Sequence, residues 1–191
     1  VVEALLQEAG EHNIKTDLRY FGSAGSYKAL LKERGIRVVS VISSKIRNYV
    51  SFLNVLAVFK FFVGFLQALI KVYFFMPEVV FSKGGPGALP IIYACRFYRI
   101  PVVIHESDSV PGRTSRLSAS HANAVELGWK EAAGYFQSHG KVQVVGVPVR
   151  SALVSELSPA EARRTLGVKD EKPILFFVGG SQGAAAVSYT H

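Results

Sequence analysis

Residues 79–105, VVFSKGGPGALPIIYACRFYRIPVVIH, contain a short apolar run, a glycine-rich turn, a helical stretch and a second apolar run. The two runs, at 79–82 and 101–105, are rich in Val, Ile and Phe and do not alternate with polar residues. Such runs are typical of strands buried on both faces of a parallel sheet. A strand, a helix at 88–98 and a second strand in this order predict one β-α-β unit of an α/β sheet.

The same alternation continues on both sides of this unit. We therefore predict a doubly wound, Rossmann-like α/β domain over residues 1–148, which binds ligands beyond the carboxyl ends of its strands. The other strand-like runs are at 18–22, 38–42, 142–147 and 174–178, and the other helical stretches are at 27–33, 129–136 and 159–166.

Beyond this domain the composition becomes polar, which indicates a linker over residues 149–172. Within it, Ser158 followed by Pro159 is typical of a helix start. Residues 173–191 then read as the first strand and turn of a second α/β domain. The chain begins inside a helical pattern, without the strand and loop that usually open such a domain, so we expect a fragment cut at both ends.

Composition excludes several classes of protein. Of the 191 residues, 49% are hydrophobic, enough for a large core, which excludes intrinsic disorder. Cys95 is the only cysteine, which excludes a disulfide framework and a cysteine-rich zinc site and fits a reducing compartment. Residues 1–11 lack the basic start and the small-residue cleavage site of a signal peptide.

The net charge of +8 is concentrated in one part of the chain. Residues 34–105 contain nine Lys or Arg and a single acid, Glu78, whereas the bases and acids elsewhere cancel. A basic and apolar segment indicates an anionic partner such as a membrane surface or a phosphorylated ligand. The bases lie among long apolar runs and not in dense clusters, so we expect no nucleic acid partner.

Residues 49–76 are the most apolar stretch of the chain and include seven phenylalanines. Lys60, Gly64, Gln67 and Lys71 recur at helical spacing, so they predict a polar stripe on one face of a helix. Three interpretations stay open: an amphipathic helix lying in the plane of a membrane, a covering helix of the sheet, or a spanning helix. A span is disfavoured, because a lysine near mid-bilayer costs about 3 kcal/mol.

The glycine-rich segment SKGGPGA, at 82–88, follows one predicted strand and precedes a helix. Glycines let the backbone approach a ligand closely, and the helix start behind them presents free N–H groups to an anion. An ordinary turn between a strand and a helix has a similar sequence. The segment alone therefore does not decide between a ligand site and a turn.

Four polar residues, HESD at 105–108, follow the next predicted strand, where ligand contacts gather in α/β sheets. Two alternatives need no ligand. Asp108 or Ser109 could cap a helix beginning at residue 110 or 111, and His105 could be a structural histidine. No metal-ligand spacing accompanies His105, so we expect no metal site and no cofactor.

A third segment, GGSQGA at 179–184, follows the run at 174–178 and should open a helix. The Ser181 hydroxyl and the backbone amides beside it can bind a diphosphate, and Gly183 allows close packing of helix on strand. The segment is neither a Walker A loop nor a dinucleotide fingerprint. A glycine-rich turn without a ligand is the alternative.

Four segments, in this order, resemble the MurG family of bacterial glycosyltransferases over about residues 20–184. They are SKGGPG at 82–87, IPVVIHESD at 100–108 with Pro111 and Gly112, GVPVR at 146–150, and GGSQGA at 179–184. The resemblance implies an inverting, metal-independent transfer of GlcNAc from UDP-GlcNAc to undecaprenyl-pyrophosphoryl-MurNAc-pentapeptide, a lipid-linked pyrophosphate acceptor. It also implies a peripheral protein on the cytoplasmic face of the cell membrane, with anionic lipids as partners.

The fold implied by the resemblance is GT-B, in which a Rossmann-like acceptor and membrane domain precedes a UDP-sugar-binding domain. Motif matching also implies site residues. The donor would be held by Arg150, Gly180, Ser181, Gln182 and Gly183. The acceptor would be held by Gly84, Gly85, Gly87, His105 and Asp108.

The chain departs from the family pattern at several positions. The family's first glycine-rich loop, whose histidine is often proposed as catalytic, would precede Val1, so we assign no catalytic base and expect this fragment alone to be inactive. Pro86 replaces a usual tyrosine, Val147 replaces a usual asparagine, and Asp108 stands where some members carry asparagine. After Ala184 the tail no longer follows the pattern.

Two other functions are compatible with the segments. One is a related glycosyltransferase acting on another glycolipid, such as diacylglycerol. The other is a non-catalytic, membrane-recruiting half of a split GlcNAc transferase. The beginning of a carboxyl domain at 173–184 argues against the second.

Overall fold

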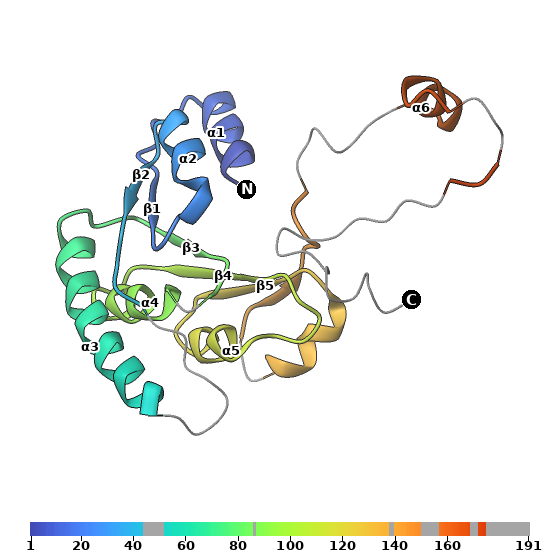
Figure 1. Cartoon of the computed structure of the whole chain (residues 1–191). Helices are drawn as coiled ribbons and strands as arrows, with labels where there is room; N and C mark the ends of the chain where they lie inside the picture. The colour runs from blue at the N-terminus through green and yellow to red at the C-terminus, as the bar shows by residue number, and fades with distance from the viewer. Residues whose placement is uncertain (44–51, 86, 138–139, 150–156, 169–171, 175–191) are drawn as a thin grey trace. The chain divides into compact units, whose positions relative to one another are not determined.

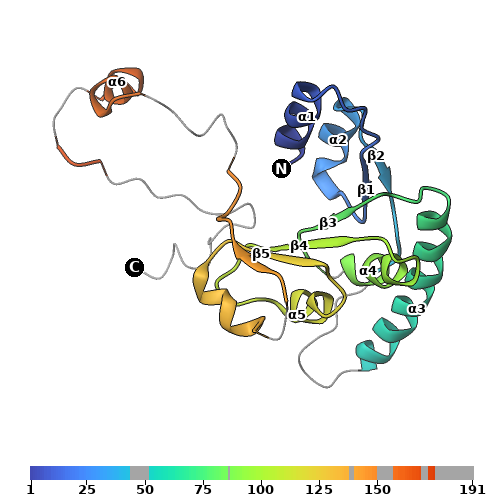
Figure 2. The same ribbon diagram turned by 180° about the vertical axis from the view of Figure 1, so that it is seen from behind.

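A computed structural model describes residues 1–43, 52–85, 87–137, 140–149, 157–168 and 172–174. The chain divides into two compact units, Val1–Pro148 and Val149–His191. Figures 1 and 2 show the ribbon from opposite sides.

The larger sheet of the first unit has four parallel strands in the order β3-β4-β5-β6. Because all four strands run the same way, their carboxyl ends lie at one edge of the sheet. The prediction that the runs at 79–82, 101–105 and 142–147 share one parallel sheet is confirmed. The strands are β3 (Val80–Ser82), β4 (Val102–Glu106), β5 (Ala124–Leu127) and β6 (Val142–Val144).

The first two predicted strands pair with each other in a separate parallel sheet. They are β1 (Arg19–Phe21) and β2 (Arg37–Val39). Two helices, α1 (Val2–Glu11) and α2 (Lys28–Glu33), lie beside this small sheet in Figure 1, and a short 3-10 turn, η1 (Gly25–Tyr27), precedes α2.

Two helices cover the larger sheet from the same side, α4 (Ala88–Phe97) and α5 (Arg113–Ala119) (Figures 1 and 2). The main hydrophobic core lies between α4 and the sheet, and α3 (Phe52–Tyr73) packs on α4 and adds to it. A second cluster joins β5, α5 and the 3-10 turn η2 (Lys130–Tyr135). The main core includes Ala68, Val72, Ile91, Ile92, Ala94, Cys95, Val102 and Ile104.

The long helix α3 lies with its polar stripe toward the protein, opposite to the arrangement expected of a covering helix whose polar stripe faces solvent. The Ile42 backbone N–H donates to Gln67 Oε1 at 3.1 Å, and Lys71 Nζ donates to the Ser40 carbonyl at 2.5 Å. Gly64 is buried where a Cβ would come within 2.0 Å of the Ile42 carbonyl oxygen. The stripe therefore satisfies backbone groups of the chain leaving β2, which need partners. Only Lys60 of the four residues is exposed.

The opposite face of α3 is apolar and exposed. By length and composition α3 includes the single candidate membrane span among the described residues, Leu56–Tyr73, of which only 22% is buried. A core helix of this length would be mostly buried, so α3 is not one. Six exposed apolar residues of α3 recur at helical spacing, and an exposed phenylalanine follows the helix: Leu56, Phe59, Phe62, Leu66, Ile70, Tyr73 and Phe74. We call these seven residues the α3 apolar face.

Phe61 and Phe65 do not belong to this face. They stack on each other at 6.5 Å between ring centroids, and Phe61 meets the Tyr93 ring edge-on at 5.7 Å. Phe65 packs against the main core. Of the three neighbouring phenylalanines Phe61, Phe62 and Phe65, only Phe62 therefore lies on the exposed side.

Three local predictions need correction. The strand β5 was missed, because its four residues, AVEL, form too short a run to stand out from the sequence. The helix predicted at 129–136 is instead the 3-10 turn η2 (Lys130–Tyr135). Neither Asp108 nor Ser109 caps a helix: α5 begins at Arg113 after Gly112, with no side-chain cap.

The second unit contains α6 (Pro159–Thr165), whose start is the predicted one. Ser158 Oγ accepts from the Glu161 backbone N–H at 3.3 Å, and Glu161 Oε2 accepts from the Ser158 N–H at 2.8 Å. This reciprocal pair is a capping box. The strand predicted at 174–178 and the segment at 179–184 lie outside the described residues, apart from Ile174, which is not in a strand.

Candidate functional site

The loop after β3 turns sharply before α4 begins. Gly84 and Gly85 have φ values of +78° and +91°, which residues with a Cβ rarely adopt. The Gly84 backbone N–H donates to Ser82 Oγ at 3.2 Å, and the Ala88 N–H donates to the Gly85 carbonyl at 3.1 Å. Gly87 precedes α4 without a side-chain cap. The start of α4 is therefore not occupied by a capping side chain and can face an anion.

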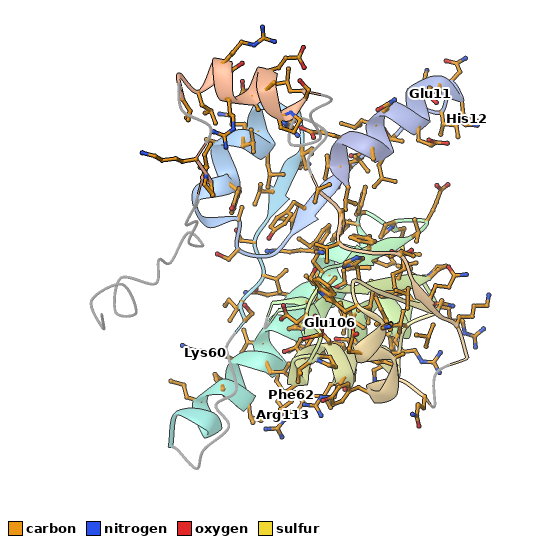
Figure 3. All side chains as sticks on the ribbon, turned by 90° about the vertical axis from the view of Figure 1, so that its right-hand side faces the viewer. Glu11, His12, Lys60, Phe62, Glu106 and Arg113 are labelled. Carbon is orange, nitrogen blue, oxygen red and sulfur yellow. The ribbon has the colours of Figure 1, made fainter. Side chains whose placement is uncertain are left out.

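The end of β4 and the loop after it carry both buried and exposed polar groups. His105 and Glu106 are buried, Ser107 is half-buried and Asp108 is exposed. Glu106 Oε1 accepts from the Asp108 backbone N–H at 2.9 Å, which fixes the turn. Figure 3 shows Glu106 inside the fold, whereas the exposed residues Lys60 and Phe62 lie on different sides of α3. Of the two residues here that were predicted to bind the acceptor substrate, His105 and Asp108, only Asp108 presents its side chain to solvent.

Lys83 joins the two loops. Its Nζ lies 2.9 Å from His105 Nδ1 and also donates to Ser107 Oγ. The backbone of Ser107 is held in turn, because Trp129 Nε1 donates to its carbonyl at 3.0 Å. Partial burial lowers the pKa of Lys83 below its ordinary value, and the charges of Glu106 and Asp108 act in the opposite direction.

His105 has a partner on each ring nitrogen. Nε2 lies 2.9 Å from the Gly146 carbonyl oxygen, which can only accept, so these partners assign the proton to Nε2. Nδ1 then has a lone pair and accepts from the Lys83 ammonium. With 1% of its surface exposed, His105 is fixed inside the protein. A direct contact of its ring with a ligand would require these bonds to break.

Glu106 leaves one oxygen unused. Its Oε2 is buried and has no hydrogen-bond partner among the described residues. The backbone carbonyl of Glu106 accepts from the Gly128 N–H at 2.8 Å, so the backbones at the ends of β4 and β5 are joined. No group of three or more His, Cys, Asp or Glu that could hold a metal ion occurs in the described part of the chain.

The site expected from the sequence therefore lies in part on one sheet edge. Gly84 and Gly85 follow β3, His105 lies near the end of the neighbouring strand β4, Asp108 follows β4, and Gly87 stands at the start of α4. Lys83 is not among the predicted site residues, although its place directly after a predicted strand was the available signal. The donor candidates Arg150, Gly180, Ser181, Gln182 and Gly183 lie outside the described residues.

A hollow beside this edge is lined by two arginines. Arg113 and Arg116 lie with Pro111, Gly112 and Leu117 at the start of α5. Arg116 also lies over the Tyr135 ring, 5.4 Å from its centroid. The hollow adds positive charge next to the loop after β4.

Residues 3–126 match the glycosyltransferase family 28 N-terminal domain. This stretch contains the loops after β3 and β4, and so all the described candidate residues for the acceptor.

Two curated relatives are each named as a UDP-N-acetylglucosamine–N-acetylmuramyl-(pentapeptide) pyrophosphoryl-undecaprenol N-acetylglucosamine transferase. The protein of Legionella pneumophila (strain Lens) is 36% identical over 173 residues, 90% of this chain and 47% of the relative. That of Clostridium tetani is 33% identical over 169 residues, 88% of this chain and 47% of the relative. The chain spans about half the length of the curated relatives it matches. The predicted resemblance to the MurG family is confirmed.

The crystal structure of Acinetobacter baumannii MurG matches the fold with a TM-score of 0.57. The two chains are 23% identical, and the match covers 80% of this chain and 42% of that one. The predicted Rossmann-like parallel sheet is thus confirmed as the fold of the first unit.

Proposed function

Because the chain belongs to glycosyltransferase family 28, we propose that the protein carrying it transfers GlcNAc from UDP-GlcNAc to undecaprenyl-pyrophosphoryl-MurNAc-pentapeptide. The observation that carries this proposal is the match of 90% of the chain to a curated transferase of that name at 36% identity. In this reaction an acceptor hydroxyl attacks the anomeric carbon of GlcNAc, and UDP leaves with the bonding electrons.

The first unit would hold the acceptor. An acceptor pyrophosphate needs N–H donors and positive charge, and the turn at Gly84 and Gly85 offers backbone groups beside the start of α4. Asp108 is exposed at the same edge and could contact the sugar or peptide part of the acceptor. Electrostatic stabilisation of this kind needs no protein nucleophile.

The donor side belongs to residues outside the described part of the chain. We propose that Ser181 and its neighbours Gly180, Gln182 and Gly183 bind the UDP diphosphate and that Arg150 lies at the donor cleft. The base that deprotonates the acceptor hydroxyl is assigned to no residue of this chain. We accordingly propose that residues 1–191 alone do not turn over substrate.

The α3 apolar face supports a peripheral membrane location. Phe59, Phe62 and Leu66 are 66%, 59% and 60% exposed, an arrangement costly in water and favourable at an acyl boundary. The net charge of +8 in residues 34–105 would favour anionic lipids. A lipid-linked acceptor and a soluble sugar nucleotide meet at such an interface, and we propose that it is the cytoplasmic face of the cell membrane.

A complementation experiment tests the proposal. The complete reading frame that encodes these residues is expressed in a bacterium whose own transferase of this name is depleted. The proposal predicts restored growth and no accumulation of the unglycosylated lipid intermediate. Continued accumulation of that intermediate, with the protein present in the cells, would contradict it.

A further inference from the structure

The ammonium of Lys83 is held by neutral groups alone. Its partners are the imidazole Nδ1 of His105 and the hydroxyl of Ser107. No ion pair of Lys83 with a carboxylate occurs among the described residues. Its hydrogen bonds therefore involve no carboxylate, and the charges of Glu106 and Asp108 act on it without direct contact. A lysine held by a carboxylate would have that charge neutralised by contact.

The groups that hold Lys83 are themselves held by other parts of the first unit. His105 is buried and bonded through Nε2 to the Gly146 carbonyl, and the Ser107 carbonyl accepts from Trp129 Nε1. The Lys83 ammonium has three N–H donors, of which these two contacts use two. In the part of the chain that the structure describes, no third partner meets it.

Lys83 also stands beside backbone N–H groups that favour an anion. It directly follows β3 and precedes the Gly84–Gly85 turn and the uncapped start of α4. Lys83 itself is exposed, so a ligand at this edge can reach its ammonium.

From this geometry we propose that Lys83 binds a diphosphate group through its ammonium, and that His105 and Ser107 are positioning residues that aim it. The proposal rests on the proposed function for the source of that group, the lipid-linked acceptor. A nucleoside diphosphate offers the same chemistry, so the test separates the two. His105 then contributes to acceptor binding through Lys83 and not by touching the ligand.

The first measurement is equilibrium binding of the 191-residue chain to farnesyl diphosphate, to UDP and to farnesol. Lys83→Met should weaken binding of farnesyl diphosphate about 10- to 100-fold, as the loss of a hydrogen bond to a charged group does. Binding of farnesol should not change, because it has no diphosphate. The matched control is Lys32→Met, which removes an exposed lysine of α2 and should leave all three affinities unchanged.

The second measurement tests the positioning roles with a double-mutant cycle. His105→Phe keeps an aromatic ring but removes Nδ1, the atom that accepts the hydrogen bond from Lys83. It should weaken farnesyl diphosphate binding about as much as Lys83→Met. In the Lys83→Met background it should add nothing. If circular dichroism shows that His105→Phe is unfolded, Ser107→Ala is used instead. Ser107→Ala should lower the affinity for farnesyl diphosphate a few-fold when Lys83 is present and not at all in the Lys83→Met background.

Each outcome decides the proposal. Unchanged farnesyl diphosphate binding in Lys83→Met, or a loss confined to UDP, would overturn the acceptor assignment. Additive effects of the two substitutions would overturn the positioning roles. These failures differ from failure of the proposed function. If the complete protein carrying Lys83→Met transfers GlcNAc as fast as the unmodified protein, only the inference about Lys83 is refuted. Absence of transfer by the unmodified protein refutes the proposed function alone.

Discussion

Cys95 is the only cysteine of the chain and lies fully buried in α4 at the centre of the main core. Burial raises the pKa of its thiol to about 12, so the reactive thiolate is scarce at pH 8. We expect a thiol reagent to modify the native protein very slowly and to modify one thiol per chain at once in denaturant. Rapid modification of the native chain would show that the core around α4 is open.

Ser181 and Arg150 carry the donor side of the proposal. Replacing either with alanine in the complete protein should raise the KM for the donor or lower kcat/KM. The loss should correspond to about 1–3 kcal/mol, the usual effect of losing a hydrogen bond to a charged group. Steady-state kinetics at varied UDP-GlcNAc concentration measure the effect. Kinetics equal to those of the unmodified protein would remove these residues from the donor site.

At single residues, the sequence predicted that polar residues after two neighbouring strands meet at one sheet edge, but not the direction of each side chain. Polar residues after β3 and β4 are visible in the sequence, and they do meet at one edge. That His105 is buried and bonded to Gly146, 41 residues later, depends on the loop after β6, which sequence spacing does not reveal. Lys83 was overlooked for the same reason, since its role depends on His105 and Ser107.

Among the elements, α3 shows the limit of helical periodicity most clearly. The spacing of Gly64, Gln67 and Lys71 correctly predicts one stripe, but its polar character suggested solvent. The backbone of residues 40–42 supplies partners for that stripe, so it faces inward and the apolar side faces out. A pattern within one helix does not show which other segment will meet it.

Gly64 tests the packing of α3. In a helix alanine is favoured over glycine by about 1 kcal/mol, but here a Cβ would strike the Ile42 carbonyl at 2.0 Å. Gly64→Ala should therefore lower the free energy of unfolding by about 1–3 kcal/mol, a typical cost of overpacking. The control is Gly10→Ala in α1, where nothing lies within 4 Å of the added Cβ, and which should be neutral or stabilising. Denaturant unfolding measures both changes in the free energy of unfolding. Changes of the same sign for the two variants would contradict this packing.

The α3 apolar face tests the membrane proposal. Phe59→Ser, Phe62→Ser and Leu66→Ser together should reduce binding to neutral and anionic vesicles alike, because these side chains are exposed and their loss leaves the core intact. The unmodified protein should prefer anionic vesicles, and salt should weaken that preference without abolishing binding. Vesicle sedimentation measures each.

The control for this experiment removes exposed apolar residues from another element. Leu5→Ser and Leu6→Ser on α1 should leave vesicle binding unchanged. Circular dichroism checks that each variant is folded. A folded triple variant that sediments with vesicles like the unmodified protein would refute insertion of α3.

For the whole molecule, the order of runs and helices was enough to predict one parallel sheet from residues 79–147, because buried parallel strands are continuously apolar. The separate pairing of β1 with β2 was not predicted, since strand order is not contained in hydrophobic patterning. The second α/β domain remains a prediction, because residues 175–191 lie outside the described part of the chain.

The central claim is the transfer of GlcNAc to a lipid-linked pyrophosphate. It is tested most directly by incubating the complete protein with labelled UDP-GlcNAc and either undecaprenyl-pyrophosphoryl-MurNAc-pentapeptide or diacylglycerol, and measuring label in the lipid product. We predict label only in the pyrophosphate-linked acceptor, attached through a β-linkage that inverts the donor configuration. Label in diacylglycerol, or in neither lipid, would contradict the claim.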